Sequence, residues 1–172
     1  MTAASALWLA TGAALGQEPD FKPWERAALS AVKAINSGNA DLFLAWTHPE
    51  EQYRLKAMFM RRLLTQTQTQ GEGTLEAQLR PYGVRNLEEL ARMPEAAFIA
   101  ISIPSQYAAN DAVMREAMSQ TTVKITKTVK VEEDHYEVHL ALHVPLAEKP
   151  LDKVLVANVV REGDAWKYNG FR

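Results

Sequence analysis

The period of the apolar residues changes once along this chain, near Thr121, and that change limits the fold more than any other feature. Before it, apolar residues recur every three or four positions, which is the spacing of one face of a helix. After it, they alternate with polar residues, which is the spacing of one face of a strand. We therefore expect an α+β protein in which N-terminal helices pack on a curved C-terminal antiparallel sheet of about four strands.

Caps and prolines divide the helical part into segments. Pro23 is suited to the first turn of a helix that ends near Gly38, and Asn39 is suited to capping a second helix that ends before Pro49. A third helix is expected to begin at Pro49, with its apolar residues along one stripe, namely Tyr53, Ala57, Met60 and Leu64.

Three further expectations concern the middle of the chain. The run from Thr65 to Gly73 is polar and contains glycines, which favours a frayed helix end followed by a connector. Pro104 is expected to end the helix that restarts at Pro94, because proline lacks the N–H that a helix interior uses. A last helix is expected from about Asn110 to Ser119.

The alternating part predicts two hairpins. The first strand is expected to place four aliphatic residues on one face, namely Val123, Ile125, Val129 and Val131. The segment EEDH supplies a turn into a second alternating run from Tyr136 to Leu146. The dipeptide Gly163-Asp164 predicts the turn between the last two strands.

Three histidines, His135, His139 and His143, are spaced by four residues and raise the question of a metal site. On a strand, positions four apart are separated by about 13 Å. Zinc needs ligand nitrogens about 2.0 to 2.1 Å away, so neighbouring members of this row cannot share one ion. Because the apolar row occupies the other face, we expect the histidines on the solvent side, and we predict no metal site and no cofactor.

Composition excludes several function classes. The 172 residues include 19 Lys and Arg against 21 Asp and Glu, and this near balance argues against nucleic acid as a partner. The absence of cysteine excludes disulfides, thiolate metal sites and a cysteine nucleophile. No G-x-S-x-G elbow, phosphate-binding glycine loop, dinucleotide fingerprint or H-E-x-x-H motif occurs.

The N-terminus has the composition of an export signal. Residues 1–16 carry no charge, and the apolar run from Ala3 to Leu15 is shorter than the roughly 20 residues that cross a bilayer. Small residues at Ala14 and Gly16 suit cleavage before Gln17. We predict a signal peptide at 1–16 and a single domain at 17–172, periplasmic or secreted, with no membrane association after cleavage. The alternative is the apolar N-terminus of a cytosolic protein.

Candidate site residues are polar or aromatic side chains expected beside a pocket. His48, in AWTHPEE, lies between two predicted helices, where an imidazole acts in proton transfer or simply caps the next helix. Acidic pairs such as Glu50 and Glu51 lie at helix starts, where the helix dipole explains them. No catalytic residue is assigned. The candidates for ligand binding are Trp46, His48, Tyr53, Tyr136, Asn158 and Tyr168.

Two stretches resemble a known superfamily. The segment VKAINSGNADLFLAWTHPEE and the ending VLVANVVREGDAWKYNGF look like the nuclear transport factor 2-like superfamily, which includes ketosteroid isomerase and polyketide-cyclase-like proteins. The resemblance runs from about Pro23 to Phe171, and no catalytic motif of the superfamily is matched. It implies a cone-like domain whose pocket serves isomerisation, cyclisation or protein contacts.

From these observations we expect an exported bacterial protein that binds a small apolar ligand or a protein partner without catalysis. The first alternative is an isomerase- or cyclase-like enzyme that uses a pocket histidine and tyrosine, in which case His48 and Tyr53 would share a cavity. The second is an interaction protein in which the sheet face pairs with another copy to form a homodimer.

Overall fold

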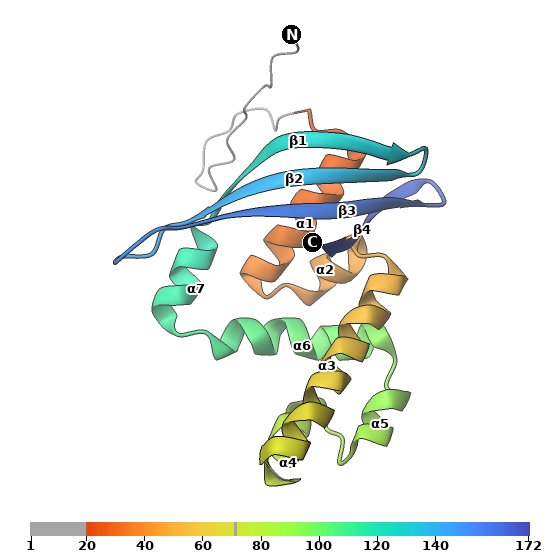
Figure 1. Cartoon of the computed structure of the whole chain (residues 1–172), viewed down its shortest axis with the longest axis vertical. Helices are drawn as coiled ribbons and strands as arrows, with labels where there is room; N and C mark the ends of the chain where they lie inside the picture. Colours follow the sequence, from red (N-terminus) through yellow and green to blue (C-terminus); the bar gives the residue numbers. More distant parts are fainter. Residues whose placement is uncertain (1–19, 71) are drawn as a thin grey trace.

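The computed structural model describes residues 20–70 and 72–172, so the predicted signal peptide lies outside the described residues. The helices come first and the sheet second, which confirms the predicted α+β class (Figure 1). The helices are α1 (Pro23–Ser37), α2 (Ala40–Trp46), α3 (Pro49–Gln70), α4 (Glu72–Leu79), the 3-10 turn η1 (Arg80–Tyr82), α5 (Leu87–Arg92), α6 (Glu95–Ala109) and α7 (Ala112–Ser119). The strands are β1 (Thr122–Glu132), β2 (His135–Val144), β3 (Leu151–Glu162) and β4 (Ala165–Phe171).

The four strands form one antiparallel sheet in sequence order, β1-β2-β3-β4. Helix α1 lies against one face of this sheet and contacts β2, β3 and β4 (Figure 1). On that inner face, Leu140 stands opposite Ile125 on one side and Leu155 on the other. Val138 and Ala157 are completely buried beside them. The core therefore lies between the sheet and the helices.

The first two helices begin and end where the sequence predicts. Pro23 occupies the first turn of α1, and Gly38 closes it with a φ of 64° that suits glycine. The side-chain oxygen of Asn39 accepts a hydrogen bond from the N–H of Leu42 at 2.9 Å, which caps α2. Helix α1 approaches the sheet closely because its buried face is built mainly of small residues, namely Ala27, Ala28, Ala31, Val32 and Ala34.

Helix α3 buries a different stripe from the one expected, so the predicted orientation is wrong. Tyr53 is 64% exposed and Leu64 is 50% exposed, whereas Glu51, Lys56 and Leu63 are buried. The buried side includes charged residues, and hydrophobic periodicity cannot indicate a buried face of that kind. Each buried charge is paired: Glu51 with Arg54 of the same helix, and Lys56 with groups beyond α3.

Lys56 shows how such a charge is accommodated. Its ammonium group donates hydrogen bonds to the carbonyl oxygens of Ala91, at 2.8 Å, and Met93, and it lies 3.1 Å from a carboxylate oxygen of Glu95. These groups belong to the end of α5 and the start of α6. A buried cation is tolerated when it is paired in this way. Lys56 therefore joins α3 to both helices.

Two other expectations for the helical part are wrong. Helix α3 continues through Thr65 and Thr67 to Gln70. The two hydroxyls bond within the helix, to the carbonyls of Arg61 and Leu63 one turn earlier, so these polar residues do not need a loop. Pro104 does not end α6. That helix loses one backbone hydrogen bond at the proline but buries side chains on both sides of it, namely Phe98, Ile99, Ser102 and Ile103.

A β-bulge changes the faces of β1. The pairing with β2 shifts between Ile125 and Lys127, so the chain inserts one extra residue there. Beyond the shift, Thr128 faces inward and donates to a carboxylate oxygen of Glu25 on α1 at 3.1 Å. Val129 stands opposite Glu137, on the outer face. The prediction that Val129 shares the face of Val123 is therefore wrong, because one inserted residue reverses the alternation. Val131 lies at a second shift, between Lys130 and Glu132, and is not paired with β2.

The distal half of α3, together with α4 and α5, extends away from the sheet (Figure 1). The ring of Phe59 on α3 lies 5.2 Å from that of Tyr82 and 5.4 Å from that of Phe98, which holds this extension on α6. Within residues 20–70 and 72–172, no helix combines the length and the hydropathy that crossing a membrane requires.

Candidate functional site

Three aromatic rings meet at one end of the inner sheet face. Trp24 comes from the first turn of α1, Tyr136 from β2 and Trp166 from β4. Trp24 and Tyr136 are stacked, with ring centroids 4.1 Å apart. Both contact Trp166 edge-to-face, at centroid distances of 5.4 Å and 5.2 Å. The Trp166 indole is therefore held in one orientation by two other rings.

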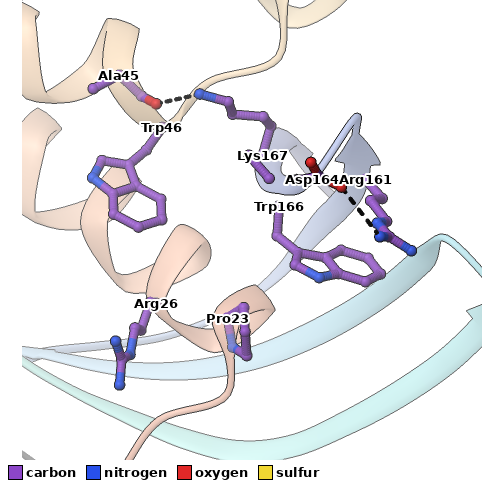
Figure 2. Close-up of a pocket in the computed structure, with 9 residues that line it drawn as sticks. Pro23, Arg26, Ala45, Trp46, Arg161, Asp164, Trp166 and Lys167 are labelled. Atoms are coloured by element: carbon purple, nitrogen blue, oxygen red, sulfur yellow. Dashed lines mark hydrogen bonds and ion pairs between the residues drawn. The ribbon is translucent and has the colours of Figure 1, made fainter.

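A cleft of about 490 Å³ lies beside Trp166. Figure 2 shows the indoles of Trp46 and Trp166 on two sides of it, and the β3–β4 hairpin with Arg161 and Asp164 beyond Trp166. The volume falls within the range usual for small-molecule sites, roughly 300 to 1,000 Å³. The lining residues are Pro23, Arg26, Ala45, Trp46, Arg161, Asp164, Ala165, Trp166 and Lys167.

The charges in the cleft lining are mainly positive. Arg26, Arg161 and Lys167 contribute three cations, and Asp164 is the only carboxylate among the residues that line the cleft. A guanidinium nitrogen of Arg161 lies 3.8 Å from Asp164, and another lies 3.6 Å from Asp134 at the β1–β2 turn. These pairs are long and their side chains are largely exposed, so they are weak.

The other two cations are positioned by backbone carbonyl groups. Lys167 donates from its ammonium group to the carbonyl of Ala45 in the last turn of α2 at 2.5 Å, which ties β4 to that helix (Figure 2). Arg26 donates from Nε to the carbonyl of Phe21 at 3.0 Å, and another of its nitrogens lies 3.8 Å from Asp20. Its side chain is 57% exposed. The guanidinium of Arg26 therefore keeps donors for a further partner, because it has five N–H groups.

Of the six candidates for ligand binding, Trp46 lines the cleft, and Tyr136 supports it through Trp166. Tyr53 is exposed on α3. His48 stands at the start of α3, where its Nδ1 accepts a hydrogen bond from the N–H of Glu50 at 3.3 Å. The backbone N–H of His48 donates to the carbonyl of Tyr168 at 2.8 Å. This is the helix-capping arrangement that the sequence allows for His48.

The remaining two candidates lie on opposite faces of the sheet. Tyr168 is buried in the core, where its ring packs edge-on against Phe43, and burial, with a smaller contribution from Glu51, raises the pKa of its hydroxyl. Asn158 is on the outer face opposite Glu137 and donates from its amide to the carbonyl of Gly170 at 3.4 Å. Neither residue lines the cleft.

The histidine row lies on a strand, as predicted, and on its outer face. Each imidazole has a different neighbour: His135 lies 3.4 Å from the side-chain oxygen of Asn158, and His143 lies 2.8 Å from a carboxylate oxygen of Asp152. His139 lies 3.9 Å from Glu137. In the part of the chain that the structure describes, no group of three or more His, Asp or Glu residues is placed to hold a metal ion.

The sequence explains Glu51 only as an acidic residue at a helix start, whereas the structure buries its carboxylate. Glu51 is 1% exposed and accepts two hydrogen bonds from the Arg54 guanidinium, at 2.5 Å and 2.8 Å. These bonds raise the pKa of Arg54. Gly170 of β4 lies directly against the pair. The pair is not part of the cleft lining, and it fastens the start of α3 to β4.

Sequence reasoning missed most of the cleft. Arg26, Arg161 and Lys167 look like solvated surface charges in the sequence, and nothing there indicates that α1, α2 and the β3–β4 hairpin bring them together. The position of Trp166 beside the Gly163-Asp164 turn was the one available signal.

No protein-family model, characterised protein or solved structure matches this chain. The likeness to the nuclear transport factor 2-like superfamily therefore stays a prediction from the sequence.

Proposed function

We propose that this protein binds a small, mainly apolar ligand in the cleft between Trp46 and Trp166 and does not transform it. The observation that carries the proposal is the pair of partly exposed indoles, from α2 and β4, on two sides of a cleft of about 490 Å³. Aromatic side chains supply large contact areas and lose few rotamers on binding, which makes such a pair a suitable clamp for a flat ligand.

Binding is favoured over catalysis because the groups suited to acid–base chemistry are engaged elsewhere. His48 caps α3, and Glu51 is paired with Arg54 away from the cleft. Asp164, the carboxylate in the lining, is fully exposed. A catalytic carboxylate is usually placed in partly apolar surroundings, and Asp164 is not. The isomerase- or cyclase-like alternative relies on His48 and Tyr53, and Tyr53 is exposed on α3.

Intrinsic tryptophan fluorescence tests the proposal with a neutral aromatic probe, 2-naphthamide. We expect saturable quenching, and we expect Trp46→Ala to weaken binding by about tenfold, which corresponds to about 1.4 kcal/mol. Tyr53→Ala is the matched control, because it removes an exposed aromatic outside the cleft. An absence of binding, or equal binding by the wild type and Trp46→Ala, would overturn the proposal. Turnover of the probe that His48→Ala abolishes would restore the enzyme alternative.

A second candidate function is self-association through the outer sheet face. It is favoured by the bulge in β1, which turns Val129 outward onto the face that carries Val154, Val156 and Val160. Val154 is 69% exposed. A sheet face with exposed β-branched side chains can pair with a copy of itself across a twofold axis. Sedimentation velocity tests this: a dimer that Val154→Lys converts to monomer supports it, and a wild-type monomer at all concentrations refutes it.

Export remains part of the proposed function. The uncharged segment 1–16 is the feature that supports it. Expression of the full chain in a bacterium, followed by cell fractionation and N-terminal sequencing, is the test. A periplasmic or secreted product that begins at Gln17 supports export, and an intact cytosolic product refutes it.

A further inference from the structure

We infer that the ligand of the Trp46–Trp166 cleft is a flat aromatic molecule that carries an anionic group, such as a carboxylate. This inference rests on the proposed function and adds the chemical class of the ligand. It is drawn from two features of the lining: a preset aromatic surface, and three cations whose partners are backbone carbonyls and long, exposed ion pairs.

The aromatic surface exists before any ligand arrives. Trp166 is held edge-on by Trp24 at 5.4 Å and by Tyr136 at 5.2 Å, so its ring need not be ordered by binding. The Trp46 side chain follows directly from the last turn of α2, which Lys167 ties to β4 through the Ala45 carbonyl. Because both indoles sit on fixed elements, a planar ring gains contact with little loss of side-chain entropy.

The charged residues of the lining indicate which polar group the ligand carries. Three cations, Arg26, Arg161 and Lys167, face a single carboxylate, Asp164, which is fully exposed and 3.8 Å from Arg161. The cations come from separate elements, α1, β3 and β4, and surround the indoles. Outside the lining, Asp20 lies 3.8 Å from Arg26 and Asp134 lies 3.6 Å from Arg161. These ion pairs are long and largely exposed, so they are weak, whereas an anionic group in the cleft would accept shorter hydrogen bonds from the same cations.

Arg26 has the greatest freedom to contact a ligand. Its guanidinium uses Nε for the Phe21 carbonyl, and its ion pair with Asp20 spans 3.8 Å, where Asp20 is fully exposed. Arginine forms paired hydrogen bonds with a planar carboxylate, and its flat guanidinium also stacks on aromatic rings. Arg161 donates to the carbonyl of Gly163 in the hairpin turn, and Lys167 donates to the carbonyl of Ala45 in α2.

The size of the cleft and the charge of the whole chain limit the ligand further. A volume of about 490 Å³ admits one or two fused rings with a short substituent. The formal charge of −2 for the complete chain opposes long-range attraction of a polyanion, so the positive lining is a local feature. A small aromatic acid fits these limits better than a nucleic acid strand.

Four probes with one ring system separate the inference from the proposed function: 2-naphthoate, 2-naphthyl phosphate, 2-naphthamide and 2-naphthylmethylammonium. Binding to the full chain is measured by calorimetry at low salt and again in about 0.5 M NaCl, where exposed charge interactions are screened. We expect 2-naphthoate to bind about tenfold more tightly than the amide, and we expect salt to remove most of that preference. Tighter binding of the phosphate than of the carboxylate would identify a phosphate-bearing ligand within the same anionic class.

The outcomes distinguish the two claims. If the acid and the amide bind equally, or the ammonium probe binds best, the anionic inference is overturned and the proposed function stands. If no probe binds, the proposed function fails and the inference fails with it. These comparisons use the wild-type protein, so they do not depend on the folding of any variant.

Charge-neutralising variants then locate the anion. We expect Arg26→Gln to reduce the preference for 2-naphthoate over 2-naphthamide by about threefold to tenfold, without a change in the melting temperature. Arg61→Gln, an exposed arginine on α3 outside the cleft, is the matched control. Arg161→Gln and Lys167→Gln are measured beside it. An unchanged preference in Arg26→Gln, Arg161→Gln and Lys167→Gln alike would overturn the inference.

Discussion

The indole of Trp24 stacks on the phenol ring of Tyr136, with centroids 4.1 Å apart and ring planes inclined by 2°. The Trp24 Nε1 is buried and has no hydrogen-bond partner within the described residues. The stack is placed behind Trp166, where it fixes one wall of the cleft.

Removal of the Tyr136 ring should affect both stability and binding. We expect Tyr136→Ala to lower the free energy of unfolding by about 2 kcal/mol, because the ring is half-buried. It should also weaken the binding of 2-naphthoate, because Trp166 loses one of its two supports. Tyr136→Phe keeps the stack and should match the wild type in both urea denaturation and calorimetry. Unchanged binding by a folded Tyr136→Ala would contradict the supporting role of the ring.

Any side chain at position 170 would contact the Glu51–Arg54 pair, so this position favours glycine. A Cβ at residue 170 would lie 2.5 Å from Nη2 of Arg54, and the residue has a φ of 100°. Gly170→Ala should therefore destabilise the protein by about 2 to 3 kcal/mol, through backbone strain and the displacement of Arg54. Gly163→Ala is the control, because φ is also positive there but a Cβ meets nothing within 4 Å. Equal melting temperatures for the two variants would contradict this account.

Replacement of Lys56 should lower the free energy of unfolding more than replacement of an exposed lysine. Its ammonium group donates hydrogen bonds to the carbonyls of Ala91 and Met93 and to Glu95, so Lys56→Met leaves both part-buried carbonyls without this donor. We expect a loss of about 2 to 3 kcal/mol in the free energy of unfolding. Lys33→Met on the exposed side of α1 should change it by no more than about 0.5 kcal/mol. Urea denaturation of both variants provides the comparison.

The buried Tyr168 predicts a loss of stability in alkali. Burial raises the pKa of its hydroxyl above the unfolded value of about 10, so the folded state holds the proton more tightly than the unfolded state. The free energy of unfolding is therefore unaffected by the ionisation of this group below about pH 10, and it declines as the pH rises further. Tyr168→Phe should therefore lose less stability than the wild type between about pH 8 and pH 11.

Tyr168→Phe and the wild type are compared by how much the free energy of unfolding of each protein changes with pH, and not by its absolute value. The variant also lacks the buried hydroxyl itself, so the absolute stabilities of the two proteins differ at every pH. Tyr82, whose pKa burial also raises, keeps some alkaline sensitivity in both proteins. Parallel urea-midpoint curves for the two proteins would contradict the prediction.

Local signals in the sequence were sufficient for the fold class. The change of period at Thr121, the cap at Asn39 and the turn at Gly163 all describe structure formed by neighbouring residues, and each prediction is confirmed. The face of Val129 was not predictable, because a bulge inserts one residue without a compositional mark. The burial of Lys56 depends on carbonyls more than thirty residues away, which periodicity does not contain.

The candidate site, like the fold, was predictable from the sequence only in part. Trp46 was identified as an aromatic residue beside His48 in AWTHPEE, between two predicted helices, and it does line the cleft. Arg26 and Lys167 were not identified, because an exposed cation in a sequence is indistinguishable from an ordinary surface charge. Only the packing of α1, α2 and β4 places these two residues beside the indoles. Binding sites assembled from several elements therefore need the tertiary structure.

The most direct test of the cleft is an NMR titration of the ¹⁵N-labelled full chain with 2-naphthoate, in which the indole N–H signals are assigned with Trp→Phe variants. The account predicts that the signals of Trp46 and Trp166 shift together and saturate with one affinity, while backbone signals around Tyr53 stay in place. Saturable shifts centred on His48 and Tyr53, with both indole signals unchanged, would contradict it.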